Sequence, residues 1–306
     1  MADRRRRLPE NVAGDFFVDD TCIDCDACRA IAPATFHDHA AQSSVYRQPE
    51  NPETRWQALK ALVTCPTASI GTESEADDVS AAVAAYPERI DDDVYFCGFT
   101  SEESFGGWSY LIVRPPARGG NVLVDSPRFT PPLVRRILEL GGIRLMFLSH
   151  KDDVADHAAF AREFGCTRIM HAADGAARLG VERIVDGTAP VSVDADLVVI
   201  PTPGHTRGHL VLLYRDRFLF TGDHLGWSPD EQTLTAFRDV CWYSWPEQTR
   251  SMERLLGYRF EWVLPGHGRI HHASADEMHA HLERCVAWMK GRRRAAGRVS
   301  RSASFS

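Results

Sequence analysis

The 306-residue chain lacks three features, each of which would assign it to a broad class. It has no apolar run long enough to span a membrane, so we expect no membrane segment. It has no excess of basic residues, because the formal net charge is −7, and we therefore expect no nucleic-acid partner. Its N-terminus is charged but has no apolar core or small-residue cleavage site, so we expect no secretory signal and a cytoplasmic location.

The chain has eight cysteines. Because it has no export signal, we do not expect them to form a disulfide framework. Four of them are scattered and are interpreted as small apolar residues: Cys97, Cys166, Cys241 and Cys285. The others follow a C-x2-C-x2-C spacing at Cys22, Cys25 and Cys28, with Cys65 ahead of Pro66. Thiolates at every third residue of a tight loop suit an iron–sulfur cluster. A structural zinc site is the weaker alternative, because zinc sites usually use two separated pairs.

The pattern of residues along the chain predicts five segments: a disordered tail (1–14), a cysteine-rich domain (15–72), a linker (73–94), a larger domain (95–292) and a second disordered tail (293–306). In the larger domain, short apolar runs alternate with helical patterns, which predicts an α/β fold. We expect helices at 53–63, 130–140, 247–256 and 275–292, and strands at 108–114, 121–124 and 143–148.

Histidines and aspartates follow short apolar runs at four places in the larger domain. The segments are Ser149-His150-Lys151-Asp152-Asp153-Val154-Ala155-Asp156-His157, Pro203-Gly204-His205-Thr206, Thr221-Gly222-Asp223-His224 and Pro265-Gly266-His267-Gly268. Side chains at strand ends converge on one edge of a sheet, and the glycines allow tight turns there. A donor set of this size can hold two divalent ions with a bridging carboxylate and a bridging hydroxide.

The cysteine-rich segment resembles a single-cluster bacterial ferredoxin over residues 15–72. A two-cluster ferredoxin has another cysteine four residues after the triplet, where this chain has Ala32. The resemblance therefore implies one cluster, and the retained Cys25 implies [4Fe–4S] rather than [3Fe–4S]. The implied cluster ligands are Cys22, Cys25, Cys28 and Cys65, and the domain would serve a redox partner.

The histidine and aspartate motifs resemble the metallo-β-lactamase superfamily over about residues 95–290. The resemblance implies an αββα sandwich, preceded here by a small α+β ferredoxin-like domain. It also implies that His205 binds a first metal ion, that His267 binds a second, and that Asp223 bridges both. The Pro-Gly-His-Thr and Gly-Asp-His segments are similar to the glyoxalase-II-like and lactonase-like branch, which cleaves thioesters and lactones.

The first motif departs from the family's H-x-H-x-D-H form. Asp152 stands where the second histidine is usual, and the loop is two residues longer before its Asp-His end. We therefore expect His150 and Asp152 on the first metal, and Asp156 and His157 on the second. Asp153 is the rival to Asp152, and otherwise it would face solvent or cap a helix. A carboxylate in place of an imidazole hardens the first site and favours iron or manganese over zinc.

These residues support two main hypotheses about function. The first is a metal-dependent hydrolase of a small-molecule thioester or lactone, with Asp156 and Asp223 as catalytic residues. The second is a non-haem iron oxidoreductase, in which the 4Fe–4S cluster delivers electrons to the metal site. A redox-responsive binding protein with a vestigial site is a third hypothesis, which the near-complete ligand set disfavours. Five aromatic residues are candidates for the substrate pocket: Trp108, Trp227, Trp242, Tyr243 and Trp245.

Overall fold

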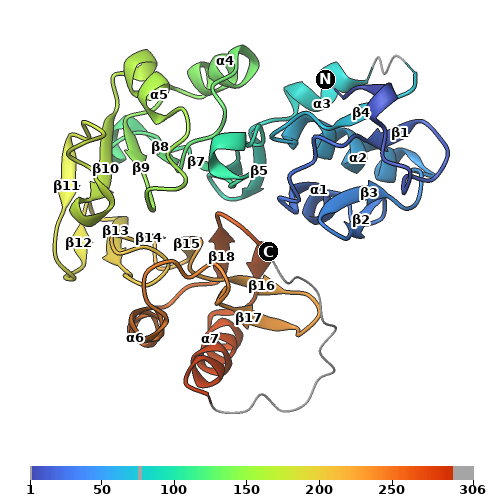
Figure 1. Cartoon of the computed structure of the whole chain (residues 1–306). Helices are drawn as coiled ribbons and strands as arrows, with labels where there is room; N and C mark the ends of the chain where they lie inside the picture. The colour runs from blue at the N-terminus through green and yellow to red at the C-terminus, as the bar shows by residue number, and fades with distance from the viewer. Residues whose placement is uncertain (1, 75–77, 292–306) are drawn as a thin grey trace. The chain divides into compact units, whose positions relative to one another are not determined.

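The computed structural model describes residues 2–74 and 78–291 (Figure 1). Within this part the chain folds into two compact units. The first comprises residues 2–110 and 127–140, and the second comprises residues 111–126 and 141–291. The first unit is thus larger than the predicted cysteine-rich domain, because it includes residues 95–110 and helix α4 (Pro131–Glu139). The predicted tail at 293–306 lies outside the described residues.

The cysteine-rich part of the first unit is a small α+β fold. It contains the antiparallel pairs β1 (Phe16–Val18) with β4 (Ile70–Thr72) and β2 (Phe36–His39) with β3 (Gln42–Val45), and the helices α1 (Ala27–Ile31) and α2 (Pro52–Thr64). Helix α2 confirms the helix predicted over residues 53–63. It begins where the Asn51 side chain accepts a hydrogen bond from the backbone N–H of Thr54, which satisfies a donor that the first turn leaves open.

Two segments predicted as tail and linker are structured. Residues Arg4–Arg6 form the 3-10 helix η1, and Arg7 pairs with Asp19 in an isolated bridge. The arginines of the predicted disordered tail form ion pairs, such as Arg7 with Glu73 at 2.9 Å. The predicted linker contains α3 (Val79–Ala84), β5 (Glu88–Asp91) and the start of β6 (Val94–Phe96), and β5 pairs antiparallel with β6. A further 3-10 helix, η2 (Glu102–Ser104), follows.

The second unit contains strands of two sheets. In one, four parallel strands lie in the order β11 (Arg183–Val185), β10 (Thr167–His171), β9 (Leu145–Phe147) and β8 (Val122–Val124). The other has the order β12 (Val191–Ser192), β13 (Leu197–Pro201), β14 (Leu210–Tyr214), β15 (Phe218–Gly222), β18 (Trp262–Pro265) and β19 (His271–His272). Its pairs are antiparallel except for β15 with β18.

Helices cover the outer faces of these sheets. Figure 1 shows α5 (His157–Phe164) on one side, and α6 (Trp245–Leu255) and α7 (Ala275–Met289) on the other. Smaller elements are β7 (Tyr110–Ile112) at the boundary of the units, the hairpin of β16 (Gly226–Ser228) with β17 (Thr233–Thr235), and the 3-10 helices η3 (Pro116–Arg118) and η4 (Ala172–Asp174). The arrangement confirms the predicted αββα sandwich.

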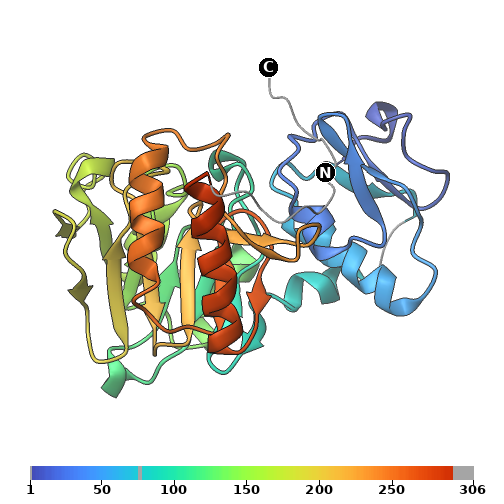
Figure 2. The same ribbon diagram turned by 90° about the horizontal axis from the view of Figure 1, so that it is seen from below.

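The main core of the second unit lies between its six-stranded sheet and helices α6 and α7. Figure 2 shows the two helices lying along this sheet. Met252 and Leu255 of α6 and Met278 and Leu282 of α7 are buried against apolar side chains of the strands, including Leu219. Every residue of β14 and β15 is buried, as expected for strands that are covered on both faces. This packing fixes the strand ends that carry the candidate site.

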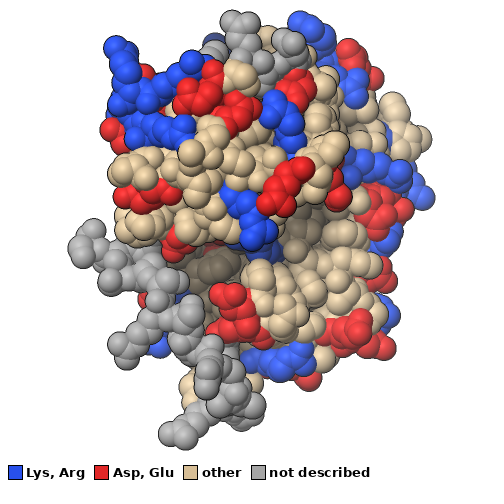
Figure 3. Space-filling view, turned by 90° about the vertical axis from the view of Figure 1, so that its right-hand side faces the viewer, with Lys and Arg blue, Asp and Glu red and all other residues tan. Residues whose placement is uncertain are grey.

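The charged surface is mixed. On the face drawn in Figure 3, basic and acidic side chains lie next to one another, and basic side chains gather at its upper left. Within the described residues, no helix combines the length and apolar character needed to cross a bilayer.

Candidate cluster chamber and metal centre

The four cysteines of the predicted cluster line one small chamber in the first unit. Asp24 and Asp26 have backbone φ angles of 60° and 68°, which coil the loop around the thiols. Backbone N–H groups donate to two of the sulfurs, from Ser43 to Cys22 Sγ at 3.4 Å and from Ser69 to Cys65 Sγ at 3.3 Å.

These thiols resist deprotonation on their own, because burial raises the pKa of Cys25 to about 12 and also raises the pKa of Cys28. Thiolates in such a chamber need a positively charged partner, and four sulfurs with N–H donors fit an iron–sulfur cluster. The other cysteines lie elsewhere: Cys97, Cys166 and Cys285 are buried, and Cys241 is partly buried. The burial of the first three is consistent with an apolar role, whereas Cys241 Sγ donates to the Gly204 carbonyl at 3.2 Å.

The histidine and aspartate motifs converge at strand ends in the second unit. His150 lies in the loop after β9, His205 in the loop after β13, Asp223 directly after β15 and His267 in the loop after β18. Their ligand atoms form two groups in which all members lie within 4.8 Å of one another. The first group is His150, His205 and Asp223, and the second is Asp153, Asp223 and His267. Asp223 belongs to both, as the family resemblance implied for a bridging ligand.

The first group has a fourth donor close by. Asp223 Oδ2 is 3.7 Å from the Nε2 atoms of both His150 and His205. Asp152 Oδ2 lies 3.7 Å from His205 Nε2 and 4.0 Å from His150 Nε2, so it faces the same space. Ser149 Oγ lies 2.9 Å from His150 Nδ1, and a hydrogen bond there directs Nε2 toward the group.

The unpaired atoms of the first group fit a cation. Both Nε2 atoms are buried and have no hydrogen-bond partner in the protein. Burial lowers the pKa of His150 to about 4, so this ring is a neutral donor at ordinary pH. Neutral imidazoles and carboxylates facing one buried space are a suitable ligand set for a divalent ion.

The second group is rich in buried carboxylate. Asp153 is only 2% exposed, and its Oδ2 atom has no hydrogen-bond partner. Burial and the nearby Asp223 raise the pKa of Asp153 well above its usual value. Burial also disfavours ionisation of Asp223, but the charge of His267 and the 2.8 Å contact to its Nδ1 outweigh burial and lower the pKa of Asp223. A divalent cation would relieve the repulsion between these carboxylates.

Asp125 is a further buried carboxyl beside this group. It accepts a hydrogen bond of 2.7 Å from the backbone N–H of Ser149, which anchors the start of the loop that carries His150. Burial raises the pKa of Asp125 to about 7, with a smaller contribution from Asp223.

The structure speaks against Asp156 and His157 as ligands of the second metal. Neither residue belongs to a donor group within the described chain. Asp156 is the N-cap residue of α5, and His157 begins that helix with Nδ1 3.0 Å from Arg168 Nη1. The positively charged guanidinium disfavours a second cation at this imidazole. The expectation that Asp153 faces solvent is wrong, and Asp153 takes the place at the second group.

Asp174 is a residue of the site that the sequence did not reveal. It accepts hydrogen bonds of 2.6 Å from Thr206 Oγ1 and the Gly208 N–H, and one of 3.1 Å from the Lys151 N–H. It thereby ties the loop of His150 to the loop of His205. A Cβ atom on Gly208 would lie 2.7 Å from Asp174, so a glycine is needed there. Nothing in the sequence distinguished it from other acidic residues, which are common in loops.

Two further histidines support the first group. His209 and His224 are fully buried, with ring centroids 5.0 Å apart, and the His209 centroid is 5.2 Å from that of His150. Burial lowers the pKa of both rings, to about 3 for His224, so both are neutral. His209 Nδ1 lies 2.9 Å from Thr202 Oγ1. Neither ring belongs to a donor group in the described residues.

The five aromatic candidates for a pocket wall fall into two sets, those next to a metal-ligand candidate and those packed elsewhere. The exposed Trp242 ring lies 6.3 Å from the His205 ring, and the N–H of the neighbouring Tyr243 donates to the His205 carbonyl. The other three have different neighbours: Trp227 stacks on His271, Trp245 meets Trp288 edge to face, and Trp108 packs at a tilt against Phe96 in the first unit. Only Trp242 and Tyr243 therefore adjoin a donor.

Comparisons with known proteins agree with this division of the chain. Residues 18–72 match the family described as the 4Fe-4S single cluster domain of ferredoxin I. A hydroxyacylglutathione hydrolase of Rhizobium etli is 31% identical over 137 residues, which is 44% of this chain and 51% of that protein. One of Anaeromyxobacter dehalogenans is 34% identical over 126 residues, covering 40% and 47%. The chain spans about half the length of these curated relatives.

Among solved structures, the B3 metallo-β-lactamase BLEG-1 is similar with a TM-score of 0.47 and 17% identity, covering 58% of this chain and 93% of that one. The two-sheet sandwich, the motifs at its strand ends and the hydrolase relatives agree with one another. The chain therefore has a single-cluster 4Fe–4S ferredoxin domain followed by a domain with the metallo-β-lactamase fold.

Proposed function

We propose that the chain is a metal-dependent hydrolase of a small-molecule thioester, with a dinuclear site in its second unit. The observation that carries this proposal is the pair of donor groups that share Asp223. His150, Asp152 and His205 would hold the first ion, and Asp153 and His267 would hold the second. Two ions bound there would lower the pKa of water and polarise the substrate carbonyl.

The residues of the chain prepare this chemistry in three ways. Ser149 and Asp174 hold the loops that carry His150 and His205, so the imidazoles need little reorganisation. His267 Nδ1 lies 2.8 Å from Asp223 Oδ1, and a proton shared by this pair would leave when the ligands bind a cation. Burial of Asp153 disfavours its charge without a cation, which couples its ionisation to metal binding.

The relatives support the thioester class, since their name refers to hydroxyacyl glutathione hydrolysis. The test is hydrolysis of a hydroxyacyl glutathione thioester, followed as released thiol, with a lactone of similar size as the comparison substrate. We expect metal-loaded protein to release thiol and Asp223→Asn protein to release none above background. Failure to hydrolyse either substrate with both metals bound would contradict the proposed function.

A second candidate is an iron-dependent oxidoreductase that receives electrons from the cluster. The observation that favours it is Asp152, a carboxylate at a position where the family usually has histidine, since oxygen ligands favour iron or manganese over zinc. Metal analysis of protein purified without oxygen distinguishes the two candidates. Iron beyond the cluster's own content favours the oxidoreductase, and two zinc ions favour the hydrolase.

A further inference from the structure

The cluster chamber is closed on most of its sides. Cys28 and Cys65 are each only 8% exposed. Cys25 is covered by Gly106, whose backbone has a φ angle of 83°. A Cβ atom on Gly106 would lie 2.8 Å from Cys25 Cβ and 2.9 Å from its Sγ atom, so only glycine allows this close approach. Gly106 follows η2 and lies outside the segment that matches the ferredoxin family.

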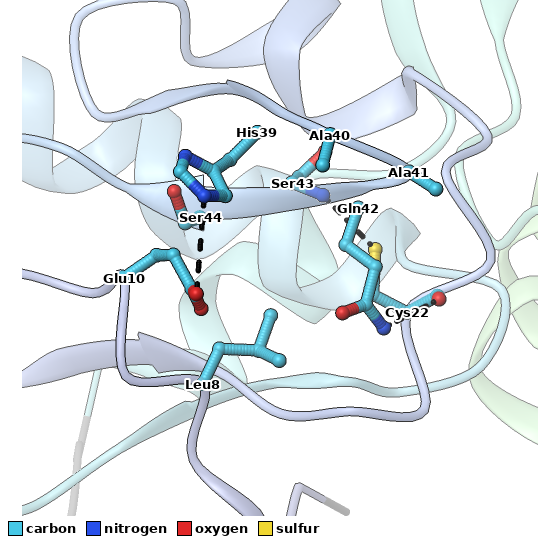
Figure 4. Close-up of a pocket in the computed structure, with 9 residues that line it drawn as sticks. All are labelled: Leu8, Glu10, Cys22, His39, Ala40, Ala41, Gln42, Ser43 and Ser44. Carbon is cyan, nitrogen blue, oxygen red and sulfur yellow. Dashed lines mark hydrogen bonds and ion pairs between the residues drawn. The ribbon is translucent and has the colours of Figure 1, made fainter.

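Cys22 differs from the other three ligands because it also borders an open cavity of about 430 Å³. The cysteine lines both the chamber and this cavity, and Ser43 does so too. Figure 4 shows the cavity between the N-terminal segment of Leu8 and Glu10 and the hairpin of β2 and β3. One thiol therefore separates the cluster chamber from a space of the size that holds small molecules.

The walls of this cavity are chemically mixed. Leu8, Ala40 and Ala41 supply apolar surface. Glu10 Oε1 lies 3.8 Å from His39 Nε2, as drawn in Figure 4. Ser44 is fully buried, and its hydroxyl has no hydrogen-bond partner in the protein although the residue lines the cavity.

The charge around the cavity favours a cation. Glu10 is the one carboxylate among the lining residues, and no lysine or arginine lines the cavity within the described chain. Residues 2–74 contain eleven Asp and Glu and eight Lys and Arg, and each of the arginines at positions 4–7 is paired with a carboxylate. A field of this sign attracts positively charged molecules and repels anions.

We propose that this cavity is the electron-exchange port of the cluster, and that it takes a small planar organic one-electron carrier with positive charge. The reduced carrier gives one electron to the cluster next to Cys22 and leaves in its oxidised form, and no covalent bond forms or breaks. The concave shape favours a small molecule over a flat protein surface, which makes direct docking of a protein the competing outcome.

The test measures the rate at which the cluster is reduced, followed without oxygen as loss of visible absorbance. Reduced methyl viologen is the cationic carrier, and dithionite supplies an anionic one. Ala41→Trp fills the cavity, and Ala34→Trp is the matched control because Ala34 is exposed in the same domain and does not line the cavity. We expect Ala41→Trp to slow reduction by viologen about ten-fold and Ala34→Trp to leave it unchanged.

Glu10→Lys tests whether the negative charge of the cavity selects the carrier, because Glu10 lies on the wall across from the hairpin of β2 and β3. We expect it to slow viologen and to accelerate dithionite, with both effects weakened by salt. Equal rates for the Ala41→Trp and Ala34→Trp proteins would place the port elsewhere. A Glu10→Lys protein with an unchanged ratio of the two rates would overturn the cationic class. If Ala41→Trp and Glu10→Lys proteins are reduced by viologen at the normal rate but more slowly by a reduced protein carrier, the cavity is a docking site for a protein instead of a port for a small molecule.

Discussion

The two candidate sites of the molecule are built on opposite principles. The cluster chamber uses four identical soft donors, three of them within seven consecutive residues, and backbone N–H groups that donate to sulfur. The metal centre uses imidazoles and carboxylates from four separate strand ends, and buried atoms of His150, His205 and Asp153 have no hydrogen-bond partner in the protein. Local sequence therefore specifies three of the four ligands of the first site, whereas the second site exists only once two sheets have folded. The two should accordingly fail independently and in different ways.

The largest expected effect distinguishes Asp153 from Asp156, the two candidate ligands of the second metal in the first motif. Replacing Asp153 with alanine should lower kcat/KM for the thioester about a thousand-fold, because losing one metal's contribution costs several kcal/mol of transition-state stabilisation. Asp156→Ala should retain most activity, because Asp156 lies at the start of α5. Steady-state kinetics and metal content of both variants decide the matter, and the reverse ranking would restore Asp156 as the ligand.

The cluster should be removable without loss of the other site. Cys28→Ala should abolish the brown colour and the broad absorption expected at about 400 nm. Metal in the second unit and thioester hydrolysis should remain, because none of its donors comes from the cysteine loop. Absorbance, acid-labile sulfide and thiol release are the measurements. Loss of hydrolysis in a folded, metal-loaded Cys28→Ala protein would show that the two sites are chemically coupled.

Asp174 tests how far the metal centre depends on tertiary structure, because it is not a ligand but holds two ligand loops together. Asp174→Asn keeps the size of the side chain but leaves one oxygen for three hydrogen bonds. We expect metal affinity to fall about 10- to 100-fold, the range typical of residues that orient metal ligands. Thr206→Val, which removes one of these bonds, should lose less. A role in folding alone would lower the thermal unfolding temperature of metal-free protein and leave its metal affinity unchanged.

The smallest effect concerns the identity of the metal. Asp152→His restores the donor type that is usual in the family and removes a negative charge from the first group. We expect the variant to shift its preference toward zinc, by about ten-fold relative to manganese or iron. Competition between the metals under equal loading conditions measures the ratio. An unchanged ratio would mean that Asp152 does not reach the first ion.

The sequence predicted these two regions unequally, and particular residues show why. The spacing of Cys22, Cys25 and Cys28 places three ligands in one loop, so the cluster needed little tertiary information. His205, Asp223 and His267 were also recognisable, because each lies in a short motif after an apolar strand. The loop from His150 to His157 was not, because its two extra residues allow several registers. Only the fold shows that Asp153 points inward, while His157 meets Arg168.

Asp174 was beyond prediction for a different reason. Its three partners come from two loops that lie 23 to 34 residues away along the chain. Nothing in the local sequence distinguishes it from an aspartate at an ordinary turn. The folded structure of the N-terminal segment was missed in the same way, because Arg6 and Arg7 form their ion pairs with Asp20 and Glu73 only after the first unit has folded.

The central claim is that one carboxylate, Asp223, serves two ions in a centre that is independent of the cluster. Quantifying metal and acid-labile sulfide in wild-type and Asp223→Ala protein, both purified without oxygen, tests it most directly. We expect wild-type protein to contain two metal ions beyond the cluster, and the variant to lose both while its cluster iron and sulfide remain unchanged. Retention of both additional ions in Asp223→Ala protein, or loss of the cluster along with them, would contradict the account.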